Sequence, residues 1–200
     1  MGSRRMALRG AVLVTVLSLA VAMSPGLASA SHGGTGGSAK GTTTCFASGT
    51  LRASPPLTLG SGKATTLSLT ATLHGCTGTQ ASKVFQATLS GKSTDASASC
   101  TAFENEFPPL SAKVSYKTLS GSLAPTKLAF SGGMLNKAGN PISIMYPVSG
   151  GKGAAQGSFA SKKATMMLNL GEIYSQWVSS CQSSAGLSTM TVIGTSFVTV

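Results

Sequence analysis

The sequence predicts an all-β fold, a two-sheet antiparallel β-sandwich of about ten short strands, with a closed barrel as the alternative. Three observations favour this fold class. Apolar and hydroxyl residues alternate in many segments, which is the period of two typical of strands with one buried face. Gly, Pro and Asn separate these segments throughout, as in sandwiches and barrels. An even number of widely spaced cysteines indicates two disulfides that reinforce the sheet.

The first thirty residues have the three parts of a secretory signal peptide. Met1–Gly10 carries three arginines and no acid, the apolar run Ala11–Met23 follows, and Ala28-Ser29-Ala30 supplies the small residues that a signal peptidase needs. This run is shorter than the about 20 residues that span a bilayer, and we expect no transmembrane segment in the mature chain. Ser3–Arg9 partly matches a twin-arginine motif, so the export route stays open.

Two further parts are expected after the signal peptide of residues 1–30. Residues 31–41 include five glycines and no large apolar residue, a composition typical of a flexible tether. Residues 42–200 then form a single β-sandwich domain, since this length suits one core.

The strands of the first half are centred on the segment Ala64–Cys100. One strand is expected over Thr42–Leu51 and another over Leu57–Leu59, which follows Pro55-Pro56. Three alternating segments come next, and their apolar members are predicted to face the core. These members are Leu67, Leu69, Ala71 and Leu73; Phe85, Ala87 and Leu89; Ala96, Ala98 and Cys100.

The second half repeats the alternation and contains one candidate helix. Its Phe103–Pro109 segment ends in two prolines, which favours a loop or a sheet edge. The apolar sets predicted on one face after it are Ala112, Val114 and Tyr116; Leu128 and Phe130; Ile142, Ile144, Tyr146 and Val148; Ala164, Met166, Leu168 and Leu170. Met190, Val192 and the Phe197–Val200 run are expected to form the last strands. A short helical turn competes with strand only over Glu172–Ser180.

The cysteines can pair in three ways, and we predict that Cys45 pairs with Cys76 and Cys100 with Cys181. This arrangement joins the early strands locally and ties the last third of the chain to its middle. Strand parity places His74 outward, whereas Cys76 should face inward. A β-bulge at Gly75 is the simplest way to change parity between them.

The chain resembles a group of uncharacterised secreted actinobacterial proteins that are rich in Thr and Gly and contain four cysteines. The matching residues are Gly75-Cys76, Ser99-Cys100, Gly157-Ser158-Phe159, Cys181, Gly186-Leu187 and Gly194. The resemblance implies an exported β-sandwich over most of the mature chain. It implies no activity, so no functional residues carry over.

The sequence contains few groups that could perform chemistry. His74 is the only histidine in the expected domain, and with Cys76 it makes one loose pair, so we expect neither a metal site nor a Ser-His triad. Gly91-Lys92-Ser93 lacks the earlier glycine of a phosphate-binding loop and is interpreted as a turn. No cofactor is expected.

Glu104 and Glu106 are the only close carboxylate pair in the sequence. Two residues apart on an extended chain, they would face the same side, an arrangement that suits acid–base work on a glycan. Two solvated acids on a Pro-bounded loop are the alternative interpretation, and no second polar cluster in the sequence could bind a sugar.

The chain is strongly basic. Loss of Arg4, Arg5 and Arg9 with the leader would lower the Lys+Arg count from 15 to 12, which against four acids leaves a mature charge of about +8. Apart from Arg52, these cations are lysines spread along the chain: Lys40, Lys63, Lys83, Lys92, Lys113, Lys117, Lys127, Lys137, Lys152, Lys162 and Lys163. Nucleic-acid sites usually combine Arg with aromatic residues, which this pattern lacks.

These observations lead to three functional hypotheses. The first is a secreted, monomeric and non-catalytic extracellular or cell-envelope binding module that attracts anionic envelope polysaccharide or another surface polymer. The second is a carrier that holds a small apolar ligand between its two sheets. The third is a glycan-acting enzyme that uses Glu104 and Glu106.

Overall fold

A computed structural model describes residues 39–60, 62–78, 84, 86–119, 121–147, 155–159 and 164–200. Residues Gly34–Val200 form one compact unit. The predicted signal peptide and residues 31–38 of the predicted tether lie outside the described residues, as do Phe85 and Val148.

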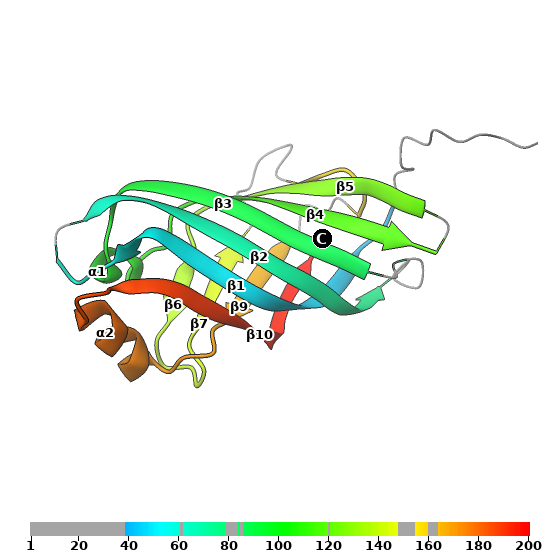
Figure 1. Ribbon diagram of the computed structural model, residues 1–200. Coiled ribbons are helices and arrows are strands. Elements are labelled where there is room, and N and C mark those ends of the chain that lie inside the picture. The colour runs from blue at the N-terminus through cyan, green and yellow to red at the C-terminus, as the bar shows by residue number, and fades with distance from the viewer. Residues whose placement is uncertain are drawn as a thin grey trace, which may run out of the picture. The chain divides into compact units, whose positions relative to one another are not determined.

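The described part of this unit contains one antiparallel sheet of ten strands, curled into a half-barrel (Figure 1). The predicted all-β class and strand number are confirmed, but the two-sheet sandwich is wrong. The sheet is also not a closed barrel, because its strand order β6-β7-β9-β10-β1-β2-β3-β4-β5-β8 ends at β6 and at β8. The strands are β1 (Thr43–Leu57), β2 (Lys63–Gly78), β3 (Gln86–Ala98), β4 (Leu110–Thr118), β5 (Gly121–Phe130), β6 (Met134–Asn136), β7 (Ser143–Pro147), β8 (Ala155–Gln156), β9 (Thr165–Asn169) and β10 (Leu187–Thr199).

Long strands and sequential pairing explain why one sheet replaces two. Strands β1 to β4 each pair with the next strand in the sequence, and β10 returns to pair with the free side of β1. Four strands have 13 or more residues, so the twist that each neighbour adds can accumulate along them and curl the sheet. A period of two shows that one face is buried, but it does not show whether a second sheet or the curve of the same sheet covers it.

The core lies on the inner face of the curved sheet, and most residues that the alternation predicted to be buried do point toward it. Leu67, Leu69, Ala71 and Leu73 are each at most 3% exposed. The prediction fails at Ala96, which is exposed although Ala98 and Cys100 are buried. The register between β2 and β3 shifts beside this residue, because Lys63 pairs with Ala98 and Thr65 with Asp95. The extra residue changes the side to which later residues point.

The predicted bulge at Gly75 is present and brings Cys45 to Cys76. Thr44 pairs with Thr77 and Phe46 with His74, so β2 has one residue more than β1 between these pairs. Gly75 adopts a left-handed conformation with a φ of +56°, which glycine reaches without a Cβ clash. His74 is exposed, and the disulfide joins Cys45 to Cys76 with 4.0 Å between their Cα atoms.

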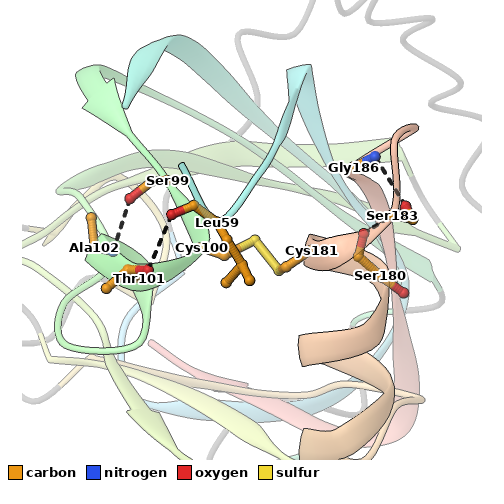
Figure 2. The surroundings of a disulfide bond; sticks show 9 residues. All are labelled: Leu59, Ser99, Cys100, Thr101, Ala102, Ser180, Cys181, Ser183 and Gly186. Carbon is orange, nitrogen blue, oxygen red and sulfur yellow. Dashed lines mark hydrogen bonds between the residues drawn. A yellow bond between two sulfur atoms is a disulfide. The ribbon is translucent and has the colours of Figure 1, made fainter. Parts of the chain in front are cut away.

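Two helices lie at one end of the sheet and are joined by the second predicted disulfide, Cys100–Cys181 (Figures 1 and 2). They are α1 (Cys100–Phe103) and α2 (Tyr174–Gln182). The helical turn expected over Glu172–Ser180 is confirmed as α2, whereas Cys100 starts α1 instead of ending a strand. The Ser99 hydroxyl accepts a hydrogen bond of 3.1 Å from the backbone N–H of Ala102 and thereby caps α1.

Aromatic side chains from the helical end fill the space inside the curve. The rings of Phe103 and Phe107 lie 4.8 Å apart, and the ring of Phe107 lies 6.0 Å from that of Trp177 on α2. All three side chains are fully buried. The Pro55-Pro56 pair, expected to precede a strand, instead lies inside β1, which runs on to Leu57.

Candidate functional site

A hollow of about 530 Å³ lies on the outer face of the sheet over β3, β4, β5 and β8. Three lysines from three neighbouring strands, Lys92, Lys113 and Lys127, line it. We call it the lysine hollow, and its other lining residues are Ser90, Gly91, Ser111, Ala112, Leu128, Ala129 and Gln156.

The register of the strands explains how this hollow forms. Ser90 on β3 pairs with Lys113 on β4, which pairs with Lys127 on β5. Two residues further along the strands, where the side chains again point outward, Lys92 pairs with Ser111. The first set of paired residues therefore holds one short and two long side chains, and the second holds Lys92 beside the short side chains of Ser111 and Ala129. The short side chains leave the depression between the lysines.

The lysine hollow is positively charged and has no carboxylate in its lining. All four acidic residues of the chain belong to the described residues, and they are Asp95, Glu104, Glu106 and Glu172. Within the described part of the chain, the one ion pair joins Lys137 to Glu104, outside the hollow. Lys113 and Lys127 also lie directly opposite each other, where like charges repel.

The interpretation of Gly91-Lys92-Ser93 as a turn is wrong, and the correction concerns this site. The three residues lie inside β3, where Gly91 pairs with Leu69 on β2 and with Ala112 on β4. Ser93 is buried and Lys92 is exposed. The strand therefore directs Lys92 outward, beside the lysines of β4.

The structure gives Glu104 and Glu106 different surroundings. Glu104 Oε2 accepts a hydrogen bond of 3.0 Å from Lys137 Nζ, and a hydrogen bond from Tyr174 to Glu104 raises the pKa of the Tyr174 phenol. Glu106 instead lines a separate hollow of about 380 Å³ together with Asp95. Glu104 therefore interacts with Lys137 and Tyr174, and it does not line the hollow that contains Glu106.

The remaining candidate groups of the sequence also have definite places. His74 stacks against Phe46 on the outer face, with 6.2 Å between the ring centroids. All four cysteines are in disulfides, which is typical of proteins from an oxidising, extracellular environment. Among the described residues, no three His, Cys, Asp or Glu side chains gather in a way that could hold a metal ion. In the same residues, neither helix has the length and apolar character that crossing a membrane requires.

No protein-family model, curated protein or solved structure matches this chain. The function must therefore be argued from the geometry of the surface itself. The sequence showed each of the three lysines but not that they meet, because they are 21 and 14 residues apart along the chain. The outward parity of Lys113 and Lys127 was the available signal, and the strand register, together with the strand position of Lys92, was the missing information.

Proposed function

We propose that this chain is a secreted, non-catalytic module that binds an anionic polymer of the cell envelope through the lysine hollow. The observation that carries the proposal is the presence of Lys92, Lys113 and Lys127 on three adjacent strands, without a carboxylate between them. A polyanion would relieve the repulsion between the lysines while it gains their attraction.

The chemistry of lysine defines the expected ligand. Lysine is a hydrated point charge without the planar fork that gives arginine its bidentate specificity. The hollow should therefore respond to the density of negative charge on a polymer more than to the identity of its sugars. Attraction of this kind should weaken as the Debye length falls from about 10 Å at 0.1 M salt to about 3 Å at 1 M salt.

Retention on immobilised dextran sulfate and on purified cell envelope, across a salt gradient, tests the site. We expect the Lys92→Gln, Lys113→Gln, Lys127→Gln triple variant to elute at clearly lower salt than the unmodified protein. A triple variant of Lys40→Gln, Arg52→Gln and Lys63→Gln removes the same charge outside the hollow and is the matched control. Equal shifts in both variants would show that net charge alone binds the polymer and would refute the site.

The secreted character rests on the leader sequence and has its own test. Cleavage after Ala28-Ser29-Ala30 should give a mature protein that begins at Ser31. N-terminal sequencing of the protein from a culture filtrate checks this expectation. A first residue before Pro25 would contradict it.

A further inference from the structure

A second feature of the outer face is a row of large side chains that runs across six strands. Each member lies directly opposite the next in the strand register, from β6 through β7, β9, β10 and β1 to β2. The members of this cross-strand row are Met134, Met145, Met167, Phe197, Phe46 and His74. With strands about 4.8 Å apart, the row is about 24 Å long.

The cross-strand row is apolar and substantially exposed. Phe46, Met134 and Met145 are 47%, 71% and 54% exposed, and Met167 and Phe197 are half-buried. At about 200 Å² for each side chain, Phe46, Met134 and Met145 together present roughly 350 Å², an area at which surface patches are often functional. Methionine also adapts its shape to an apolar partner better than branched residues do.

Neutral polar residues border the row on both sides. They come from the positions two residues before or after its members, or three after His74 because of the bulge at Gly75, so they share the outward face. On one side they are Asn136, Ser143, Asn169, Thr195, Ser48 and Thr72, and on the other side Thr165, Thr199, Thr44 and Thr77. The Glu106 carboxylate lies beside Gly132, two residues before Met134, so the row has an acid at its β6 end and neutral residues along the rest of its length.

A cation lies beyond the His74 end of the same line. Leu73 pairs with Ala87, so the antiparallel register continues with Gln86 at the level of His74. Gln86 in turn pairs with Lys117 on β4, and the side chains of both residues are exposed. In the order of the strands in the sheet, the line is apolar from β6 through β7, β9 and β10 to β1. It is polar on β2 and β3 and positive on β4.

Three kinds of ligand could cover the row: a second copy of this chain, an extended peptide or an alkyl chain. The apolar row with a cation beyond its His74 end fits the alkyl chain best. A second copy of the chain would need about 800 Å² from each partner, more than twice the exposed area of the row. An extended peptide would place its backbone N–H and C=O groups against Met and Phe side chains, which cannot pair with them. A single alkyl chain has no such groups, can follow the curve of the sheet and can carry an anionic head to Lys117.

We infer that the cross-strand row binds the alkyl chain of an anionic amphiphile, with its head group at Lys117. The interaction is separate from polymer binding, because the lysine hollow shares no residue with the row. The probes are laurate and dodecyl maltoside below their micelle concentrations, which present the same twelve-carbon chain with an anionic and a neutral head. Equilibrium dialysis and titration calorimetry on the purified protein measure the affinities.

Substitutions in the row and matched controls locate the binding site. We expect Phe46→Ser with Phe197→Ser to weaken the binding of both probes at least tenfold, because these two rings lie on the third and fourth strands from Lys117 and are the row members that a twelve-carbon chain can reach. The control pair Leu119→Ser with Ile173→Ser removes exposed apolar side chains outside the row and should leave both affinities within twofold of those of the unmodified protein. Lys117→Gln should lower the affinity for laurate three- to tenfold and leave the affinity for dodecyl maltoside unchanged.

Several results would overturn the inference. Unchanged affinity in the Phe46→Ser, Phe197→Ser variant would place the alkyl chain elsewhere. A dimer in sedimentation that this variant abolishes would assign the row to self-association. Binding to vesicles of anionic phospholipid without binding to dispersed laurate would assign it to a bilayer surface. The lysine-hollow triple variant should bind both probes normally, so failure of the polymer proposal leaves this test intact.

Discussion

Lys113 on β4 lies directly opposite Lys127 on β5, so two cations face each other across neighbouring strands. Opposed residues in an antiparallel pair have Cβ atoms about 4.5–5.5 Å apart, and like charges at that distance destabilise the sheet by up to about 1 kcal/mol. Such a pair, without a carboxylate beside it, does not stabilise the fold, and the proposed anionic ligand would account for it.

The opposed lysines should therefore reduce stability while they support binding. We predict that Lys127→Gln raises the free energy of unfolding by about 0.5 kcal/mol at low salt, and by less at 1 M salt. Urea unfolding at both salt concentrations measures the change. Lys117→Gln is the control, since Lys117 lies opposite Ser122 and loses no repulsion. An equal gain in both variants would contradict the prediction.

The two disulfides should contribute unequally. Cys100 and Cys181 are 81 residues apart, and Cys45 and Cys76 are 31 apart. In the chain-entropy model, closing these loops stabilises the folded state by at most about 4.5 kcal/mol for Cys100–Cys181 and about 3.7 kcal/mol for Cys45–Cys76. We therefore predict that Cys100→Ala with Cys181→Ala lowers the free energy of unfolding more than Cys45→Ala with Cys76→Ala. The reverse order in denaturant titrations would show that strand pairing, and not loop length, dominates.

The bulge at Gly75 should tolerate no side chain. Its φ of +56° disfavours any residue with a Cβ, and a Cβ there would lie 3.2 Å from Cδ2 of Phe46. We predict that Gly75→Ala lowers the free energy of unfolding by about 1–2 kcal/mol. Gly60→Ala is the control, because nothing lies within 4 Å of a Cβ at Gly60. An equally large loss of stability in Gly60→Ala would show that the bulge is not the cause.

Glu172 should make stability depend on pH. Burial raises the pKa of its carboxyl above the usual 4.5, although it accepts a hydrogen bond from the backbone N–H of Thr191. The folded protein therefore holds this proton more tightly than the unfolded chain. The stability contributed by the protonated form is complete below pH 4.5 and is lost as the pH rises through the folded value.

The corresponding variant is Glu172→Gln, which removes the ionisation but keeps an oxygen that can accept from Thr191. We predict that the unmodified protein loses stability between pH 4 and neutrality relative to this variant. Thermal unfolding of both proteins over that range measures the difference. Parallel pH profiles would show that Glu172 ionises without hindrance in the folded state.

Much of the sheet could be predicted from the sequence because its signals are local. The alternation at Leu67–Leu73 and the change of parity at Gly75 each involve neighbouring residues, and the structure confirms both. The sandwich was wrong because the number of sheets depends on which distant strands pair. The outward position of Ala96 was missed because a bulge without glycine leaves no such signal.

The candidate surfaces were harder to predict for the same reason. Alternation places Lys113 and Lys127 outward, but Lys92 was assigned to a turn, and only the register of β3, β4 and β5 brings the three together. Likewise, Met145 and Met167 lie on faces that the pattern indicated as the exposed side. Nothing local shows that they align with Phe46, which is more than 90 residues away.

The pairing of β1 with β10 also has a consequence for the order of folding. The hydroxyls of Thr44 and Thr199 are 2.9 Å apart, although 155 residues separate them. Contacts between such distant residues form slowly, because a long loop must close before any of them stabilises the fold. The meander from β1 to β5 can assemble first from adjacent hairpins. Until β10 arrives, β1 is an edge strand with unpaired backbone groups, and in that interval the chain is most exposed to aggregation.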